Sequence, residues 1–141
     1  MSLPSLPCLI SKGESGELIT MRSGEEGEDV TVESAAGQPG IQEWVIEHHP
    51  EDKIAFRNLL FSDKYMGLHG EPGGNAPIVV SSSPLIFTLE RAGEPAKYKF
   101  YIEEDGVQLY LSVSLNEIFP SRAALQPKQL VGAPWSLRFL E

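Results

Sequence analysis

The chain has 141 residues, with 20 acidic residues against 11 lysines and arginines, a formal net charge of −9 and a single cysteine. That length is typical of one domain, since domains most often hold about 100–150 residues. The negative charge argues against nucleic acids and membrane surfaces as partners, because phosphate groups are bound by clusters of lysine and arginine, and Cys8 alone excludes an intrachain disulfide.

Short segments of alternating apolar and polar residues recur along the chain, and each is bounded by Gly, Pro, Ser or Asp. Such segments predict β-strands, whereas the 11 prolines interrupt nearly every window long enough for an amphipathic helix. In chain order the predicted strands are 7–10, 18–21, 30–32, 44–46, 54–56, 65–68, 78–80, 87–89, 98–102, 109–111, a segment around Leu125, and 135–139. The sequence therefore predicts an all-β fold.

An aromatic residue, then a polar residue or valine, then an aliphatic residue occur together at three places, beginning at Trp44, Phe87 and Trp135. The spacings are 43 and 48 residues, and the other strands repeat at a similar interval. Three units of four strands predict a β-trefoil, in which a closed barrel leaves no free sheet edge. We expect one domain over residues 1–141, with units at about 1–49, 50–93 and 94–141 and the three aromatic residues in the core.

Residues 13–33 hold most of the negative charge. This segment contains one cation, Arg22, and seven acidic residues, which gives a local charge of −6. The acidic residues are Glu14, Glu17, Glu25, Glu26, Glu28, Asp29 and Glu33. One interpretation is a solvated loop that charge repulsion keeps soluble. The other interpretation is a charged rim around a contact loop.

Three segments carry a resemblance to a known group of proteins: residues 135–139 at the end, the Gln42-Glu43-Trp44 sequence that ends the first unit, and strand 30–32 after a polar loop. They resemble the small intracellular β-trefoil proteins of mushrooms, which include protease inhibitors and lectins. The acidic balance and the mass of 15.5 kDa are most similar to the mushroom inhibitors of cysteine and aspartic proteases, with mycocypins and trypsin-inhibiting trefoils as relatives. The resemblance implies a rigid fold whose loops bind the partner.

The leading functional prediction is a protease inhibitor that occludes the cleft of papain-like cysteine proteases with residues 21–29. The residues expected to bind the protease are Met21, Arg22, Ser23, Gly24, Glu25, Glu26 and Gly27. The two glycines lack Cβ atoms and would let the backbone approach a catalytic cysteine closely. Arg22 leaves open the inhibition of trypsin-like serine proteases, whose specificity pocket is acidic. The resemblance also implies a separate aspartic-protease site, for which the sequence indicates no position.

Two further segments are secondary candidates for contact with a protease. Gly73, Gly74 and Asn75 combine a glycine pair with the residue type that legumain-type proteases recognise. Asn58 is the residue that could match the legumain-reactive asparagine of mycocypins. The apolar run 59–61 follows it, and this run either folds under the barrel or, if exposed, favours a homodimer contact.

No motif specifies an enzyme, a cofactor or a metal site. Adjacent residues on a strand point to opposite faces, so His48 and His49 cannot chelate one ion together. Cys8 lies in an apolar segment and is interpreted as a core residue. The first sixteen residues contain two prolines and no basic region, so we expect no secretory signal and a cytoplasmic location.

Carbohydrate binding is the main alternative function. Gln42-x-Trp44 is the short motif that ricin-type trefoil lectins repeat, and here the second and third units have lost the glutamine. In those lectins the motif mainly supports the fold, while an aspartate and an aromatic ring in each unit hold the sugar. The aromatic candidates are Tyr65, Tyr98, Tyr101 and Tyr110, of which strand alternation is expected to bury about half.

Overall fold

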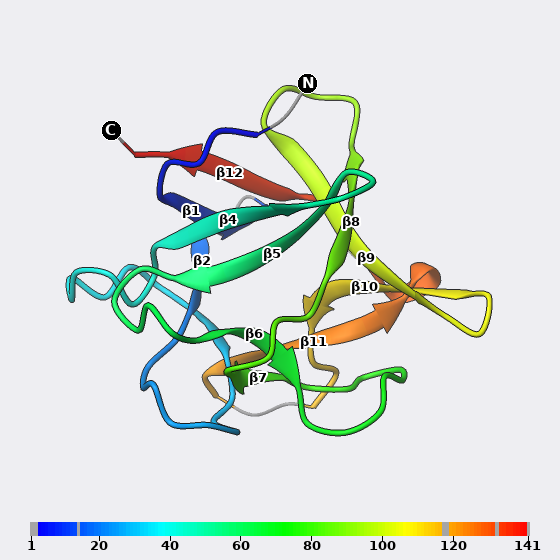
Figure 1. Cartoon of the computed structure of the whole chain (residues 1–141), viewed down its shortest axis with the longest axis horizontal. Coiled ribbons are helices and arrows are strands. Elements are labelled where there is room, and N and C mark those ends of the chain that lie inside the picture. The colour runs from blue at the N-terminus through cyan, green and yellow to red at the C-terminus, as the bar shows by residue number, and fades with distance from the viewer. Residues whose placement is uncertain (1–2, 14, 117–118, 132, 141) are drawn as a thin grey trace.

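The computed structural model describes residues 3–13, 15–116, 119–131 and 133–140. The predicted segments all become strands (Figure 1): β1 (Cys8–Lys12), β2 (Glu17–Thr20), β3 (Thr31–Glu33), β4 (Trp44–His49), β5 (Lys53–Asn58), β6 (Tyr65–Leu68), β7 (Ile78–Ser81), β8 (Phe87–Arg91), β9 (Lys97–Glu104), β10 (Val107–Val113), β11 (Ser121–Pro127) and β12 (Trp135–Phe139). One 3-10 turn, η1 (Lys128–Leu130), follows β11. Glu14, which belongs to the acidic segment, and the first two residues of the chain lie outside the described residues.

Six of the strands form a closed ring. Antiparallel pairing runs from β1 to β4, β5, β8, β9 and β12 and returns to β1. The first and last strands therefore lie side by side, which brings the two ends of the chain to one side of the molecule (Figure 1). Closure removes the free sheet edges of the barrel, as the sequence analysis expects.

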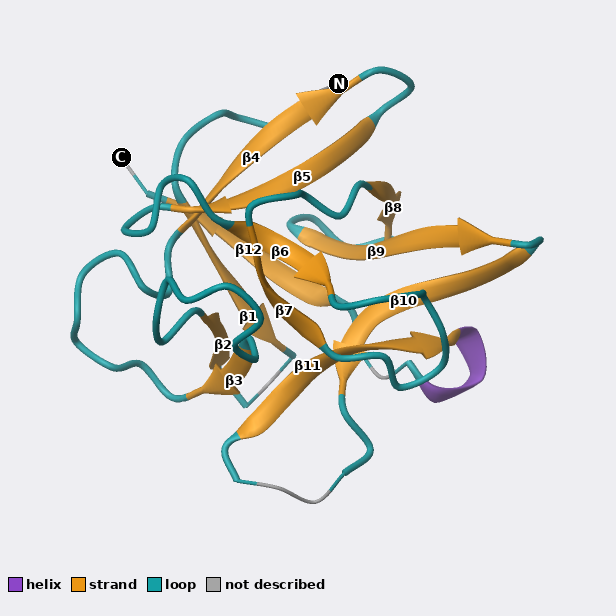
Figure 2. Cartoon of the chain, turned by 60° about the horizontal axis from the view of Figure 1, so that its bottom comes forward, coloured by secondary structure: helices purple, strands orange, loops and turns teal. Residues whose placement is uncertain are grey.

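The other six strands form the hairpins β2–β3, β6–β7 and β10–β11, which cover one end of the barrel (Figure 2). Backbone hydrogen bonds join them near the centre: Val30 N donates to Ile78 O and Ala123 N donates to Val30 O, both at 2.9 Å. The register also places Arg122 of β11 opposite Thr31 of β3. The loop that leads into β3 therefore lies against both of the other units.

The three repeated aromatic residues are in the core, as predicted, with Trp44 and Phe87 0% exposed and Trp135 4% exposed. The two indoles do more than pack. Trp44 Nε1 donates to Ile19 O and Trp135 Nε1 donates to Leu111 O, each at 2.9 Å. Each bond satisfies a buried donor and ties the last strand of a unit to its second strand. Two of the three units thus share the same indole hydrogen bond, whereas Phe87 fills the equivalent place by packing alone.

Cys8 lies fully buried in β1, in agreement with its interpretation as a core residue. Burial raises the pKa of its thiol to about 12, because the apolar surroundings destabilise the thiolate. The side chain therefore stays protonated at neutral pH and acts as a small apolar group. Among the described residues, no helix has the length and apolar character needed to cross a membrane.

Candidate functional site

A surface hollow of about 300 Å³ lies where the loop before β3 meets β11. It is called the β2–β3 hollow here, and its lining residues are Arg22, Ser23, Glu28, Asp29, Thr31, Pro120 and Arg122. Two of them, Arg22 and Ser23, belong to the loop that the sequence analysis selects. Pro120 and Arg122 come from the third unit, about 90 residues further along the chain, and only the β3–β11 pairing brings them to the site.

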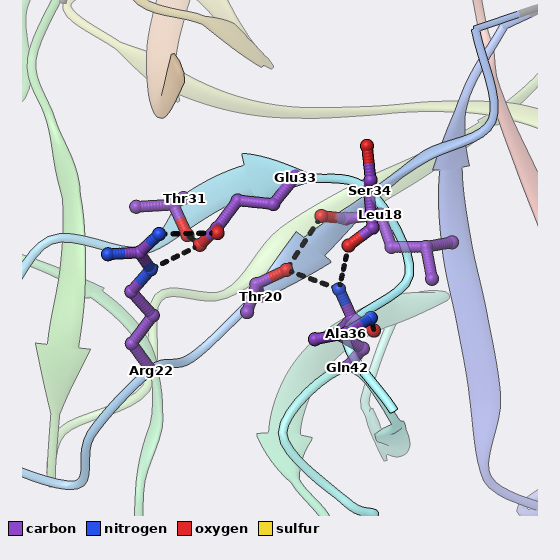
Figure 3. A network of polar contacts seen from close by, with 8 residues as sticks. All are labelled: Leu18, Thr20, Arg22, Thr31, Glu33, Ser34, Ala36 and Gln42. Carbon is purple, nitrogen blue, oxygen red and sulfur yellow. Dashed lines mark hydrogen bonds and ion pairs between the residues drawn. The ribbon is translucent and has the colours of Figure 1, made fainter. Parts of the chain in front are cut away.

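Arg22 and Glu33 form a two-point ion pair beside the hollow (Figure 3). Nε and Nη2 of Arg22 each donate to one carboxylate oxygen of Glu33, both at 2.6 Å, and the Thr31 hydroxyl also donates to that carboxylate. Such planar pairing fixes the orientation of both groups. The hydrogen bonds from Arg22, and more weakly that from Thr31, hold the pKa of Glu33 below its ordinary value, against the opposing effect of its partial burial. The same pairing raises the pKa of Arg22.

A second ion pair, between Arg122 and Asp29, also lines the hollow. Arg122 Nη1 lies 3.0 Å from Asp29 Oδ2, and both side chains remain partly exposed. Together the two pairs place two guanidinium groups and their carboxylate partners at one hollow. Guanidinium groups donate hydrogen bonds and carboxylates accept them, so the hollow offers both kinds of partner to one ligand.

The buried amide of Gln42 supports the β2–β3 region from below (Figure 3). Its Nε2 donates to Thr20 Oγ1 at 3.0 Å and to Ser34 O at 2.9 Å, while its Oε1 accepts from Ala36 N at 2.9 Å. One side chain thus joins β2 to the segment that follows β3. This agrees with the expectation that the glutamine of the Gln-x-Trp motif mainly supports the fold.

An exposed aromatic ring precedes one of the lining residues in the chain. Phe119 is 94% exposed and directly precedes Pro120, which lines the hollow. The sequence pattern gives no prediction of a binding role for Phe119, Pro120 or Arg122. An aromatic residue directly before a proline, between two predicted strands, is the local signal that points to an exposed ring in a connection.

The remaining residues of the predicted protease-binding loop do not form a projecting wedge. Met21 is 0% exposed and belongs to the core. A Cβ atom added at Gly24 would lie 2.7 Å from Cδ1 of Phe61, so this glycine allows close packing within the protein. Gly27 N donates to Val80 O at 2.8 Å. The loop is therefore attached along β7 and does not project freely.

The acidic residues of this loop differ in their surroundings. Glu26 accepts hydrogen bonds from Lys64 Nζ at 3.3 Å and from Ser82 N at 3.1 Å. Although desolvation opposes the shift, these bonds lower the pKa of Glu26. Glu25 is exposed on the same loop. Part of the acidic excess thus attaches the loop to the second unit, and part of it is solvated.

Both asparagines proposed for legumain contact have structural roles. Asn75 Oδ1 accepts from Leu115 N at 2.9 Å and from Gln126 Nε2 at 2.8 Å, and its backbone has a positive φ of 63°. Asn58 is 0% exposed, and its Oδ1 caps the turn that follows β5. Gly73 and Gly74 lie at a turn, and a Cβ atom added to either of them would meet no close neighbour. Both asparagine side chains are thus bound by hydrogen bonds within the protein, Asn58 in the core and Asn75 at a half-buried position.

The remaining candidate residues are the histidines and tyrosines, together with any metal-binding group in the part of the chain that the structure describes. Within these residues no group of three or more His, Cys, Asp or Glu side chains converges on a point that could hold a metal ion. His48 Nε2 lies 2.9 Å from Leu3 O. Among the tyrosines, Tyr98 and Tyr110 are buried, whereas Tyr65 and Tyr101 are partly exposed, as strand alternation predicts.

No family model and no curated protein sequence matches the chain, but several solved structures do. The agglutinin of Rhizoctonia solani matches with a TM-score of 0.77 and 16% identity over 99% of both chains. The ricin B-like lectin of Macrolepiota procera in complex with lactose matches with a TM-score of 0.65 and 15% identity, covering 100% of this chain and 91% of the lectin. The designed threefold symmetric protein ThreeFoil gives 0.74 and 17% identity over 95% of this chain and 99% of its own.

These similarities correct the leading functional prediction. The proteins similar in structure include an agglutinin and a lactose-bound lectin, which favours the carbohydrate alternative over inhibition of cysteine proteases. The geometry gives the physical reason: the loop lies against β7, and Arg22 is bound by Glu33 and so is not presented as a free cation for a trypsin-like pocket. At these identities the similarity establishes the fold, and the chain is a β-trefoil.

Proposed function

We propose that the chain is a lectin that binds neutral sugars at the β2–β3 hollow. The observation that carries the proposal is the combination of two oriented arginine–carboxylate pairs with a 94% exposed phenylalanine, Phe119, that directly precedes Pro120 of the same hollow. A pyranose has hydroxyl groups around its rim and an apolar face of C–H groups. Hydrogen-bonding side chains beside an exposed ring match both properties.

The ion pairs leave hydrogen-bonding capacity for a ligand. Arg22 uses Nε and Nη2 for Glu33, so within the described residues its Nη1 remains for a sugar hydroxyl. The exposed residue Glu28 and the hydroxyl of Ser23 also line the hollow. Because the pairs are already oriented, little side-chain entropy is lost when a sugar binds.

The charges favour neutral sugars over anionic ones. Two arginines at the hollow face the carboxylates of Glu28, Asp29 and the adjacent Glu33. Both arginines are paired with carboxylates, and the chain as a whole has a net charge of −9. A sialylated glycan would therefore meet no uncompensated positive charge at this hollow.

A glycan array with neutral and sialylated glycans, probed with the labelled chain, tests the proposal. We expect binding to a subset of the neutral glycans, and immobilised lactose is a suitable first probe because the Macrolepiota lectin binds it. Phe119→Ala should weaken that binding about three- to tenfold, which is the size of effect that a lost aromatic contact gives. Leu130→Ala is the control, since Leu130 is 49% exposed on a different segment.

Two results would contradict the proposal. The first is no binding to any glycan on the array by a correctly folded chain. The second is glycan binding that Phe119→Ala leaves at the level of Leu130→Ala, which would move the site away from the β2–β3 hollow.

A further inference from the structure

A second hollow, of about 330 Å³, lies on the outer wall of the barrel, where β5, β8 and β9 run side by side. It is called the outer-wall hollow here, and its lining residues are Lys53, Ile86, Thr88, Tyr101, Ile102 and Glu103. None of these residues lines the β2–β3 hollow. The strand register pairs Lys53 with Thr88 and Thr88 with Tyr101. Residues directly opposite each other share one face of a sheet, so these three side chains stand in one row.

The ring of Tyr101 is backed by a second ring. Tyr110 lies opposite Tyr101 on β10, with ring centroids 5.3 Å apart and an interplanar angle of 45°. Tyr110 is only 1% exposed, and its hydroxyl lies 3.0 Å from Glu90 Oε1 and 3.1 Å from Gln108 Oε1. The half-buried ring of Tyr101 is therefore held by packing, and a ligand that stacks on it would not have to order it.

The polar groups around this ring have no hydrogen-bond or ion-pair partner among the residues that the structure describes. Within the described residues, the side chains of Lys53, Thr88 and Glu103 and the hydroxyl of Tyr101 take part in none of the hydrogen bonds or ion pairs of the structure. The hollow thus holds one cation, one carboxylate and two hydroxyls that are free to bind a ligand. This set contains both donors and acceptors.

The equivalent place one structural repeat earlier shows that unpaired polar side chains are not general at this position. Pairing of Ile46 with Phe56 in one hairpin and of Leu89 with Phe100 in the other aligns the two units. By that alignment Glu90, Tyr101 and Tyr110 correspond to Glu47, Arg57 and Tyr65, one structural repeat earlier in the chain.

In the group of Glu47, Arg57 and Tyr65, the polar atoms bind one another. Arg57 Nε donates to Glu47 Oε2 at 2.9 Å, and the Tyr65 hydroxyl donates to Glu47 Oε1 at 2.9 Å. Arg57 forms an ion pair with Glu47, whereas the equivalent residue Tyr101 is an aromatic ring whose polar neighbours Lys53, Thr88 and Glu103 are unpaired within the described residues. The difference at equivalent positions points to a ligand site at Tyr101 and not at Arg57.

We infer that the outer-wall hollow is a second carbohydrate site, which rests on the proposed lectin function. A neutral pyranose stacks its apolar face on Tyr101, while Glu103 accepts hydrogen bonds from its hydroxyls and Lys53 donates to them. A carboxylate and an ammonium group form the stronger, charge-assisted kind of hydrogen bond. With two separate sites, one chain can bridge two glycans and gain avidity without new contacts.

The test is a titration of the ¹⁵N-labelled chain with lactose and, separately, with methyl α-mannopyranoside, followed by amide chemical shifts. We expect one set of shifts around Tyr101 and Thr88 and a second set around Thr31 and Arg122. Tyr101→Ala should abolish the first set and keep the second. Tyr65→Phe is the matched control, because it alters the equivalent tyrosine pair of the other unit and should keep both sets.

A second variant protects the test against misfolding. Glu103 is exposed, so Glu103→Gln should leave the fold intact and weaken binding at the outer-wall hollow about tenfold, the usual effect of losing a charge-assisted hydrogen bond. Shifts confined to Thr31 and Arg122 would overturn this inference and leave the proposed function standing. Shifts confined to Tyr101 would support it and place the lectin activity there alone. If neither sugar shifts any amide at tens of millimolar, the result contradicts both the proposed binding of neutral sugars and the second carbohydrate site.

Discussion

The two hollows contain similar side chains in opposite states of pairing. At the β2–β3 hollow the charged groups bind each other, as Arg22 does with Glu33 and Arg122 does with Asp29. At the outer-wall hollow, Lys53 and Glu103 make no such bond within the described residues. The first arrangement orients its groups before a ligand arrives, and the second keeps its full hydrogen-bonding capacity for the ligand.

The difference shows that residue type alone does not identify a binding site in this fold. Paired groups contribute to the local structure as well as to recognition, so their removal affects both stability and binding. Unpaired groups at the surface contribute little to stability. Variants at the two hollows should therefore separate into those that unfold the protein more easily and those that change only binding.

The largest expected effect is on the support of the β2–β3 hollow. Gln42→Ala removes the hydrogen bonds to Thr20, Ser34 and Ala36, and we expect a loss of about 2–3 kcal/mol in the free energy of unfolding. Urea denaturation measures it. Gln38→Ala, at an exposed glutamine of the same segment, should change stability by less than about 0.5 kcal/mol. Equal effects of the two variants would show that the Gln42 network contributes nothing.

The next largest effect concerns the ring behind Tyr101. Tyr110→Phe keeps the ring and deletes the hydroxyl that lies near Glu90, so we expect a loss of about 1 kcal/mol from this buried hydrogen bond. Tyr65→Phe deletes the equivalent hydroxyl at a partly exposed position and should cost less. If both variants have the same unfolding midpoint, burial of Tyr110 does not strengthen its bond.

Acid should affect the β2–β3 hollow through Glu33, whose pKa is lowered below 4.5 chiefly by the hydrogen bonds from Arg22. A carboxyl group with a lower pKa in the folded state adds stability above its unfolded pKa, and that stability is lost as the pH falls through the folded pKa. We expect Glu33→Gln to lower the free energy of unfolding at about pH 7 by less than Gln42→Ala or Tyr110→Phe does. The variant should also lose less of this free energy than the parent chain as the pH falls below about 4.5. Parallel pH profiles of the parent chain and the variant, from urea titrations, would contradict this.

The smallest effect on stability is expected at the exposed ring. Phe119 is 94% exposed, so Phe119→Ala should leave the free energy of unfolding within about 0.5 kcal/mol of its original value, even though it should weaken glycan binding. Thermal unfolding together with binding to immobilised lactose measures both properties on one sample. A marked loss of stability would mean that Phe119 acts mainly in packing.

Much of the fold followed from local sequence patterns. Short alternating segments gave the strand positions, and the spacing of Trp44, Phe87 and Trp135 gave the threefold plan, because alternation and repetition are visible in one dimension. Cys8 as a core residue followed from its apolar neighbours. The loop before β3 was predicted to bind a protease; in the structure two of its residues, Arg22 and Ser23, line a hollow.

The candidate sites themselves could not be read from the sequence. Arg122 joins Arg22 only through the pairing of β11 with β3, and Asn75 is held by Gln126, 51 residues away. A segment that looks like a free polar loop was expected to project, yet Gly24 packs on Phe61 and Gly27 binds Val80. Whether a polar side chain is bound or free depends on neighbours that are distant in the chain.

By itself, the sequence determined an acidic all-β chain of three four-stranded units with its aromatic core, because strand formation and burial depend on local alternation. The tertiary structure alone decided which polar side chains are already paired. It pairs Arg57 with Glu47, and at the equivalent position it packs Tyr101 on Tyr110 beside unpaired polar side chains. The physical reason is that hydrogen bonds between side chains depend on cross-strand register, which the closed barrel fixes and which no single segment contains.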